Sequence, residues 1–239
     1  MLTSNQLQQN NNQETHLPQV IHLAEATISA KPTEKETPQN NDTTLSTLKQ
    51  DAATPPSSPW EKIKSSGDVL GLHTTTLSGS RCTLVMLLLD DSHSMAHHKA
   101  TSILAMQTFV KRIADAKRSG AFVGDILVSV GTVNRGIVAP YTHITNFQMT
   151  ALDDLQFRNY SPLYDAAHAA CNIQIMTASE LQAKGIQTNT VTLLITDGND
   201  TGSILSSKEL QETISKVAGT QAKNHIVATL QPKGQPQVV

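Results

Sequence analysis

The sequence predicts a three-layer α/β fold, with a mostly parallel central sheet, one antiparallel edge hairpin and helices on both faces. Short apolar runs alternate with amphipathic helical patterns, which is typical of parallel strands joined by right-handed helical crossovers. The run Cys82–Leu89 is apolar along nearly its whole length, as expected for a strand buried on both faces. A turn signal at Asn134-Arg135-Gly136 lies between two strand-like runs and indicates the hairpin.

Composition bounds the class of protein. The 239 residues suffice for one or two domains, and aromatic residues are 3% of the chain, so the core is expected to be mostly aliphatic. The net charge of -2 and the absence of clustered Lys or Arg give no footprint for nucleic acid. The N-terminal residues lack the basic and apolar regions of a signal peptide, and no apolar run reaches the length of a membrane span. A cytoplasmic protein without a membrane span is therefore expected.

Residues 1–65 differ in composition from the rest and are predicted to be a disordered tail and linker. They are rich in Gln, Asn, Thr, Pro and Ser and cannot bury enough apolar surface to offset the entropy of ordering. Within them, Gln19–Ala30 could form a short helix or a docking peptide, and 55–59 reads as a semi-rigid linker. Trp60 is expected to pack on the domain edge. The folded domain is predicted over 66–239, with its core at about 80–230.

The first half of this domain is predicted to contain up to four strands and one helix. The helix has apolar residues at helical spacing and ends at Ser119-Gly120. The predicted elements are strands at Val69–Leu77, Cys82–Leu89, Ile126–Val133 and Ile137–Tyr141, and the helix at Ala100–Ser119.

A second helix is predicted to begin near Ser161. Ser161 is a good N-cap residue, and Pro162 suits the first helical position. The helix is expected to break at Thr177, with a further turn at Ser179–Lys184.

The last part of the domain is predicted to add two strands and a helix. Val191–Thr196 reads as a second buried strand, and Ile226–Leu230 as the last strand. Between them, Ser206 and Glu209 form a capping-box pattern that opens a helix running to about Ala222.

The two cysteines, Cys82 and Cys171, fall in a predicted strand and a predicted helix. They are far apart and not in a CxxC pattern, so they are expected to be buried free thiols rather than a disulfide or zinc site.

Oxygen donors follow the predicted buried strands. Asp90, Ser92 and Ser94 come directly after the first core strand, Ser161 stands at a helix start, and Asp197 follows a later strand. Ligands of such sheets bind outside the carboxyl ends of the strands. Carboxylates and hydroxyls are hard donors, suited to Mg²⁺, Mn²⁺ or Ca²⁺.

This set resembles the von Willebrand factor type A (vWA) family and its metal-ion-dependent adhesion site (MIDAS). The family pattern is Asp-x-Ser-x-Ser, then a Thr that opens a helix, then an Asp in a Thr-Asp-Gly loop. Here the three matching elements are Asp90-Asp91-Ser92-His93-Ser94, Ser161-Pro162-Leu163-Tyr164-Asp165-Ala166 and Thr196-Asp197-Gly198. The resemblance covers about residues 80–230 and implies the Rossmann-like vWA fold.

The resemblance also implies a role for each ligand. Ser92 and Ser94 would bind the metal through their hydroxyls, and Ser161 would bind directly or through water. Asp90 and Asp197 would hold metal-bound waters or ligate the ion. Few direct carboxylates would leave the metal electron-poor, with an open position for an acidic side chain of a partner.

Two further carboxylates, Asp91 and Asp200, are expected just outside the ligand set. The chain also departs from the family pattern at three places. Ser161 replaces Thr and lacks the methyl group that stiffens the side chain, and His93 stands where the family usually has Gly. The chain ends soon after Leu230, so the sheet is expected to lack the last strand and helix unless the N-terminal region or a partner covers that edge.

The sequence therefore predicts a binding module that captures an Asp or Glu of a protein partner through Mg²⁺, or through Mn²⁺ or Ca²⁺. Family analogy suggests an AAA+ ATPase or a component of a stress-response or assembly system as partner. No enzyme is expected, because the chain has no Gly-x-Ser-x-Gly elbow, no P-loop and no Cys/His pair at usable spacing.

Three alternatives stay open. The site can be degenerate and metal-free, its loop capped by its own hydroxyls. Asp90 and Asp91 also look like the acidic pair of a receiver domain that transfers phosphoryl groups, but the strand Ile126–Val133 ends without the phospho-accepting Asp that this plan needs. His93 and His97 have i, i+4 spacing, but no third zinc ligand of the right type is apparent.

Overall fold

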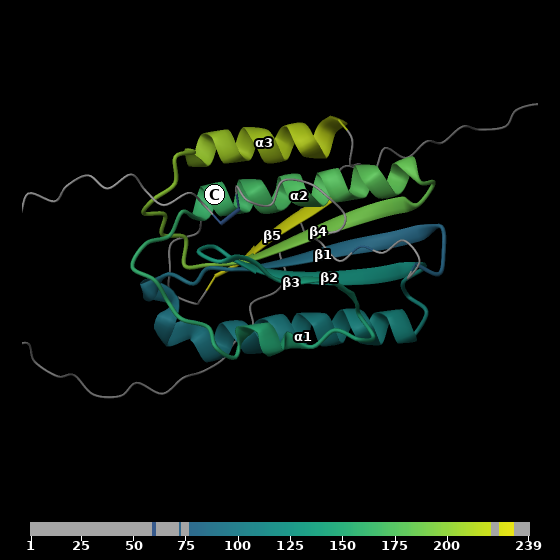
Figure 1. Cartoon of the computed structure of the whole chain (residues 1–239), viewed down its shortest axis with the longest axis horizontal. Coiled ribbons are helices and arrows are strands. Elements are labelled where there is room, and N and C mark those ends of the chain that lie inside the picture. The colour runs from purple at the N-terminus through teal and green to yellow at the C-terminus, as the bar shows by residue number, and fades with distance from the viewer. Residues whose placement is uncertain (1–58, 61–71, 73–76, 221–224, 232–239) are drawn as a thin grey trace, which may run out of the picture.

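The computed structural model describes residues 59–60, 72, 77–220 and 225–231, which form a five-stranded sheet between two helical layers (Figure 1). The strand order is β3-β2-β1-β4-β5, and every neighbouring pair is parallel except β2 and β3. The strands are β1 (Arg81–Leu89), β2 (Asp125–Thr132), β3 (Gly136–His143), β4 (Gln187–Ile195) and β5 (His225–Leu230). The α-helices are α1 (Lys99–Arg118), α2 (Leu163–Ala183) and α3 (Ser207–Thr220), and the 3₁₀ helices are η2 (His93–His98) and η3 (Met149–Leu152). The predicted fold class is confirmed.

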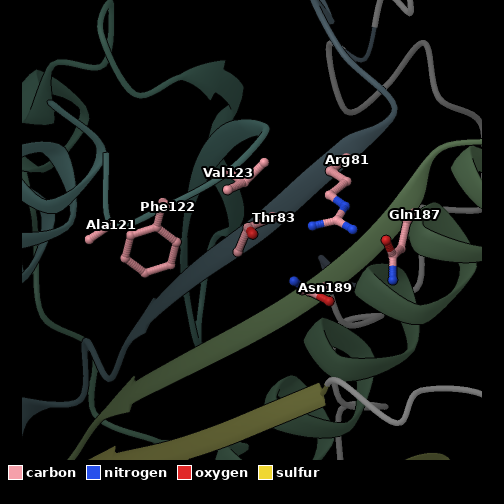
Figure 2. A pocket seen from close by; sticks show the side chains of 7 residues that line it. All are labelled: Arg81, Thr83, Ala121, Phe122, Val123, Gln187 and Asn189. Carbon is pink, nitrogen blue, oxygen red and sulfur yellow. The ribbon is translucent and has the colours of Figure 1, made fainter. Parts of the chain in front are cut away.

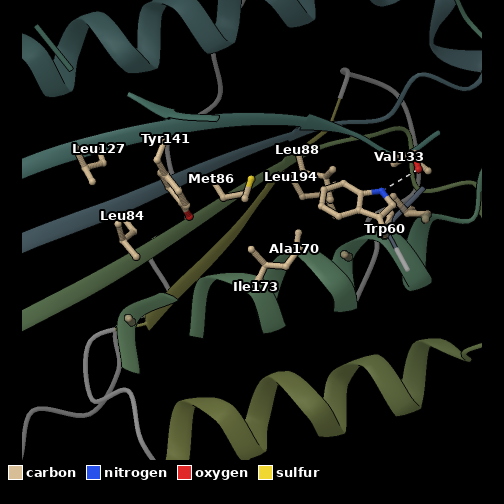
Figure 3. Close-up of a cluster of buried hydrophobic side chains, with 14 of the residues drawn as sticks. Trp60, Leu84, Met86, Leu88, Leu127, Val133, Tyr141, Ala170, Ile173 and Leu194 are labelled. Carbon is tan, nitrogen blue, oxygen red and sulfur yellow. Dashed lines mark hydrogen bonds between the residues drawn. The ribbon is translucent and has the colours of Figure 1, made fainter. Parts of the chain in front are cut away.

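The central strand β1 is buried on both faces, as its composition predicts. Every residue from Cys82 to Leu89 is buried. Even-numbered side chains such as Met86 lie in the apolar cluster beneath α2 (Figure 3). Odd-numbered side chains such as Leu87 lie in the cluster on the α1 side. The period of two along a strand divides one sequence run between two cores.

Helix α2 runs without interruption through Thr177, so the predicted break there is wrong. Thr177, Ala178 and Leu181 are all buried. Burial of this face favours continuation of the helix and outweighs the low helix propensity of one β-branched residue.

A buried glutamine fixes α2 across two strands. The Gln174 Nε2 atom donates hydrogen bonds to the carbonyls of Leu84 in β1, at 3.2 Å, and Val191 in β4, at 3.0 Å. Its Oε1 atom accepts from the Thr192 hydroxyl. Because a buried amide must keep its hydrogen bonds, α2 cannot slide along the sheet without a cost.

Helix α3 begins as predicted. The Glu209 amide donates to the Ser206 hydroxyl at 3.3 Å, and the Ser206 amide donates to the Glu209 carboxylate at 2.7 Å, which is a complete capping box. The helix is described to Thr220, and its predicted end near Ala222 lies outside the described residues.

The two thiols are free and buried, as predicted. Burial, helped by the charge of Asp125, raises the pKa of the Cys82 thiol to about 12. Burial likewise raises the pKa of Cys171 to about 11. Both side chains therefore stay protonated and act as small apolar core residues.

Several predictions for the N-terminal region fall largely outside the described residues. These include the tail before Pro59, the segment Gln19–Ala30 and most of the strand at Val69–Leu77. The described Leu72 and Leu77 pack against the α2-side cluster. No helix in the described part of the chain is long and apolar enough to cross a bilayer.

The antiparallel partner β3 forms one edge of the sheet. It pairs with β2 through the predicted hairpin, with register shifts around Val130. Pro140 lies exposed in this strand, a position that an edge strand tolerates because its N–H is not needed by a further neighbour. The opposite edge of the described sheet is β5.

A buried carboxylate stabilises the edge of the sheet where β2 begins. Asp125 accepts hydrogen bonds from the Ser78 amide at 2.6 Å and the Ser78 hydroxyl at 2.8 Å, and its Oδ1 lies 3.3 Å from His143 Nε2. Burial by itself would raise the pKa of Asp125, but these partners outweigh burial and hold that pKa below its usual range.

Replacement of Asp125 by Asn is therefore expected to destabilise the protein in a pH-dependent way. Because the pKa of Asp125 is depressed by folding, its contribution is present above the unfolded pKa, near 4, and is lost as the pH falls through the lower folded value. We expect Asp125→Asn to lower the free energy of unfolding by about 1–2 kcal/mol at pH 7. Urea unfolding of the wild type and the variant at pH 7 and pH 3 measures this loss of stability. A loss of the same size at both pH values would contradict the prediction.

Candidate metal centre

The candidate site lies where two neighbouring parallel strands end. Leu89 at the end of β1 is in register with Ile195 at the end of β4. The amide of Asp90 continues this pairing with a hydrogen bond of 2.9 Å to the Ile195 carbonyl. The sheet thereby brings Asp90 and the Thr196-Asp197 pair to the same carboxyl edge, although they are far apart in the sequence.

The Asp90 carboxylate joins three segments of the chain. Its Oδ1 atom accepts the Ser92 amide at 2.9 Å and the Ser161 hydroxyl at 3.1 Å. Its Oδ2 atom accepts the Thr196 hydroxyl at 2.7 Å. Asp90 is fully buried, and Ser161 is 1% exposed. One carboxylate therefore holds the end of β1, the start of α2 and the end of β4 together.

The two serines that follow Asp90 present their hydroxyls together. Ser92 Oγ lies 3.0 Å from Ser94 Oγ, and Ser92 is buried while Ser94 is half-buried. A backbone bridge pairs Ser92 with Arg158, and the His93 amide donates to the Arg158 carbonyl at 2.6 Å. These contacts hold the loop before η2 in place.

Asp197 completes the predicted ligand set and is 3% exposed. Its Oδ1 atom accepts the Asn199 amide at 3.1 Å, and the Gly198 amide donates to the Thr196 hydroxyl at 2.9 Å. Gly198 has a φ of 87°, a conformation that favours glycine. The Thr-Asp-Gly sequence thus supplies a hydroxyl, a carboxylate and the backbone freedom of one tight turn.

Two buried carboxylates, Asp90 and Asp197, lie near each other at this edge of the sheet. Burial raises the pKa of Asp90, and the nearby charge of Asp197 raises it further, while hydrogen bonds from Thr196 and Ser92 oppose the rise. A divalent cation would compensate both charges. The donors present are carboxylates and hydroxyls, so the residues fit a hard ion such as Mg²⁺ and do not fit a soft one.

The histidines near this loop do not complete a zinc site among the described residues. The rings of His97 and His98 lie with centroids 3.8 Å apart. Burial and the neighbouring His97 lower the pKa of His98, against the opposite effect of Asp197. The described part of the chain has no group of three or more His, Cys, Asp or Glu placed to hold a metal. The candidate site is of another kind, since it has two carboxylates and depends on hydroxyls.

Asp91 points away from the ligand set and organises the turn between β2 and β3. Its Oδ2 accepts the Thr132 hydroxyl at 2.9 Å, and its Oδ1 accepts the Asn134 amide at 2.8 Å and Asn134 Nδ2 at 3.0 Å. Asn134 Nδ2 also donates to the Tyr160 carbonyl at 3.0 Å, next to Ser161. Asp91 therefore links the loop that carries Asp90, through Asn134, to the segment that carries Ser161.

The start of α2 differs from the prediction. Ser161 is not its N-cap, because the helix is capped at Pro162 without a side-chain hydrogen bond, and the Ser161 hydroxyl is directed to Asp90. Asp200 instead accepts the amides of Leu163, at 2.8 Å, and Tyr164, at 3.4 Å. A carboxylate at this helix end satisfies open amides and complements the helix dipole.

Further side chains tie the Asp197–Leu205 loop to α2. Ser203 Oγ accepts the amides of Tyr164, at 2.9 Å, and Asp165, at 3.2 Å, and donates to Asp200 at 2.5 Å. The Asp165 carboxylate in turn accepts the amides of two residues of this loop, Ile204 and Leu205. The loop that carries Asp197 is thereby fixed to the helix that follows Ser161.

Sequence reasoning assigned no supporting role at the site to four residues: Thr132, Asn134, Thr196 and Ser203. Thr196 could have been identified, because it is a hydroxyl residue between a buried strand and the candidate ligand Asp197. The partners of Asp91 are Thr132, the last residue of β2, and Asn134, which follows that strand. Their contact with Asp91 depends on strand order, which local patterns do not show.

A separate hollow of about 300 Å³ lies at the amino-terminal ends of β1 and β4, the ends opposite to the candidate site (Figure 2). It is lined by the first residues of β1 and β4 and by the loop after α1: Arg81, Thr83, Ala121, Phe122, Val123, Gln187 and Asn189. Asp90 follows Thr83, a lining residue of the hollow, by seven residues along β1, a distance of roughly 23 Å. The hollow is therefore not part of the candidate metal centre.

Comparisons with known proteins do not assign the chain to a family: no protein-family model matches it, and no curated protein matches its sequence.

Thr196 provides a test of the buried network. Thr196→Val keeps the shape but removes the donor to Asp90 Oδ2 and the acceptor of the Gly198 amide. We expect a loss of about 1–3 kcal/mol in the free energy of unfolding, because buried polar atoms are left without partners. Thr196→Ser keeps the hydroxyl and is the matched control. Urea unfolding of both variants measures the free energy of unfolding. An equal loss of stability in Thr196→Val and Thr196→Ser would contradict the prediction.

Proposed function

We propose that the chain is a metal-dependent protein interaction module of the vWA type. A divalent cation is held by the hydroxyls of Ser92, Ser94 and Ser161, with Asp90 and Asp197 as water-holding or direct ligands. The observation that carries the proposal is the convergence of three separate segments on the buried Asp90 carboxylate. The order of the matching sequence elements supports it, as do their positions after the ends of β1 and β4 and before the start of α2.

The proposed ligand is an acidic side chain, an Asp or Glu of a partner protein. Hydroxyls are neutral donors, so where Asp90 and Asp197 hold metal-bound waters instead of binding the ion themselves, no carboxylate of the chain is bound to the ion directly. An ion held in this way keeps affinity for a further carboxylate. Mg²⁺ is the proposed ion, and Mn²⁺ or Ca²⁺ share its preference for oxygen.

The module is proposed to bind rather than to catalyse. Among the described residues, the hydroxyls of Ser92, Ser94 and Ser161 are hydrogen-bonded to one another or to a carboxylate, and not to a histidine that could act as a base. An AAA+ ATPase or a component of a stress-response or assembly system in the cytoplasm is the proposed type of partner, by family analogy.

A metal-free interaction domain is the second candidate, and one observation favours it. Both oxygens of Asp90 already accept hydrogen bonds from protein groups, so the loops close around this carboxylate without an ion. The hydroxyl oxygens of Ser92 and Ser161 nevertheless keep lone pairs that can bind a metal. The metal titration described next distinguishes the two candidates.

Calorimetric titration of Mg²⁺ and Mn²⁺ into the purified chain tests the metal site. We expect the wild type to bind, and Ser92→Ala and Asp197→Ala to lose roughly tenfold or more in affinity, because each removes an oxygen ligand or its charge. Ser119→Ala, an exposed serine at the end of α1, is the matched control and should bind as the wild type does. A folded wild type that takes up neither ion would contradict the proposal.

Acetate tests the open coordination position. We expect acetate to tighten Mn²⁺ binding to the wild type, because its carboxylate occupies the position proposed for the side chain of the partner. Mn²⁺ titrations with acetate and with chloride at equal ionic strength measure this. Unchanged Mn²⁺ affinity would show that the bound ion offers no position to a carboxylate.

A further inference from the structure

Trp60 lies outside the sheet in the sequence but inside the core in the structure. It is 3% exposed, whereas the sequence predicts only an edge contact. Figure 3 shows the indole beside Leu88 and Leu194, at the end of the α2-side cluster nearest the candidate site. The ring therefore reaches beneath the carboxyl ends of β1 and β4.

Gly131 makes the room for this indole. A Cβ atom at Gly131 would lie 2.7 Å from Cη2 and 3.1 Å from Cζ2 of Trp60. Gly131 lies within β2 and does not have a positive φ, so the backbone conformation does not require glycine. A glycine inside a strand normally weakens it and often marks a close approach of another group. Here that group is Trp60.

One peptide group connects Trp60 to Asp91. The indole Nε1 donates to the Val133 carbonyl at 3.0 Å (Figure 3). The amide of the next residue, Asn134, donates to Asp91 Oδ1 at 2.8 Å. These are the two polar ends of a single planar peptide unit. Rotation of that unit would break both hydrogen bonds, so the indole and the carboxylate fix its orientation together.

This peptide group lies between the loops that carry the candidate ligands. The Val133 amide donates to the Leu89 carbonyl at 3.0 Å, one residue before Asp90. The Asn134 side chain reaches the Tyr160 carbonyl at 3.0 Å, one residue before Ser161. Displacement of the Val133–Asn134 peptide would therefore disturb the loops of both Asp90 and Ser161.

We propose that Trp60 is a positioning residue for the candidate metal centre, acting through the Val133–Asn134 peptide and Asp91 on the loops of Asp90 and Ser161. The metal part of this inference rests on the proposed function, whereas the positioning of the loops does not. Trp60, which precedes every strand of the sheet in the sequence, thereby helps to hold the loops of the site in place.

The central test uses Trp60→Phe, which keeps an aromatic ring in the core but removes the indole N–H. We expect hydrogen exchange of the Asn134 amide, followed by NMR, to become roughly tenfold faster relative to global unfolding. We expect Mn²⁺ affinity to fall roughly tenfold, as for other groups that orient metal ligands. Unchanged protection of the Asn134 amide in folded Trp60→Phe would overturn the proposal.

A second variant displaces the ring without changing it. Gly131→Ala should push the indole out of its place, and Trp60 is the only tryptophan, so a red shift of the fluorescence reports the displacement. The same acceleration of Asn134 exchange and the same loss of Mn²⁺ affinity are expected. A red shift with both of these unchanged would also overturn the proposal.

Leu181→Ala is the matched control for a purely structural effect. Leu181 is a buried residue of the same α2-side cluster, near the end of α2 far from the site. It should lower global stability and leave both the relative Asn134 exchange and the Mn²⁺ affinity as in the wild type; equal changes in this variant would overturn the proposal. Faster Asn134 exchange in Trp60→Phe together with a wild type that binds no Mn²⁺ would support the positioning of the loops and reject the metal site.

Discussion

The buried carboxylate of Asp90 is the constraint on which the carboxyl edge of this sheet depends. It has no solvent to satisfy it, so the hydroxyls of Ser161 and Thr196 and the amide of Ser92 must reach it. Each donor belongs to a different segment, and the order of the sheet alone cannot bring all three to one point. Satisfying one charge thus dictates where a loop, a helix start and a strand end are placed.

The architecture could be predicted because its signals are local and strong. The apolar run of β1, the turn at Asn134 and the capping box at Ser206 depend on neighbours in the sequence, and the structure contains all three elements. The predicted break of α2 at Thr177 failed for the opposite reason. Helix propensity is a property of the single residue Thr177, whereas the helix continues because its buried face packs on the sheet.

The candidate site was predictable only in part. Its potential ligands follow strands of the predicted sheet, so parallel topology implies that Asp90 and Asp197 meet at one edge. The hydrogen-bond partner of each side chain was harder to predict from the sequence. Ser161 looks like a helix cap by residue type, but a buried carboxylate competes for its hydroxyl, and Asp200 satisfies the helix instead. The burial of Trp60 depends on a partner 73 residues away, which no local pattern reveals.

The two edges of the described sheet differ in what they offer to another chain. In β3, the exposed Pro140 removes one backbone donor, and the register shifts around Val130 interrupt the regular ladder. Both features hinder the addition of a further strand. The described β5, His225–Leu230, has no proline and keeps a regular register with β4. The addition of a further strand, whether in assembly or in aggregation, is consequently disfavoured at β3.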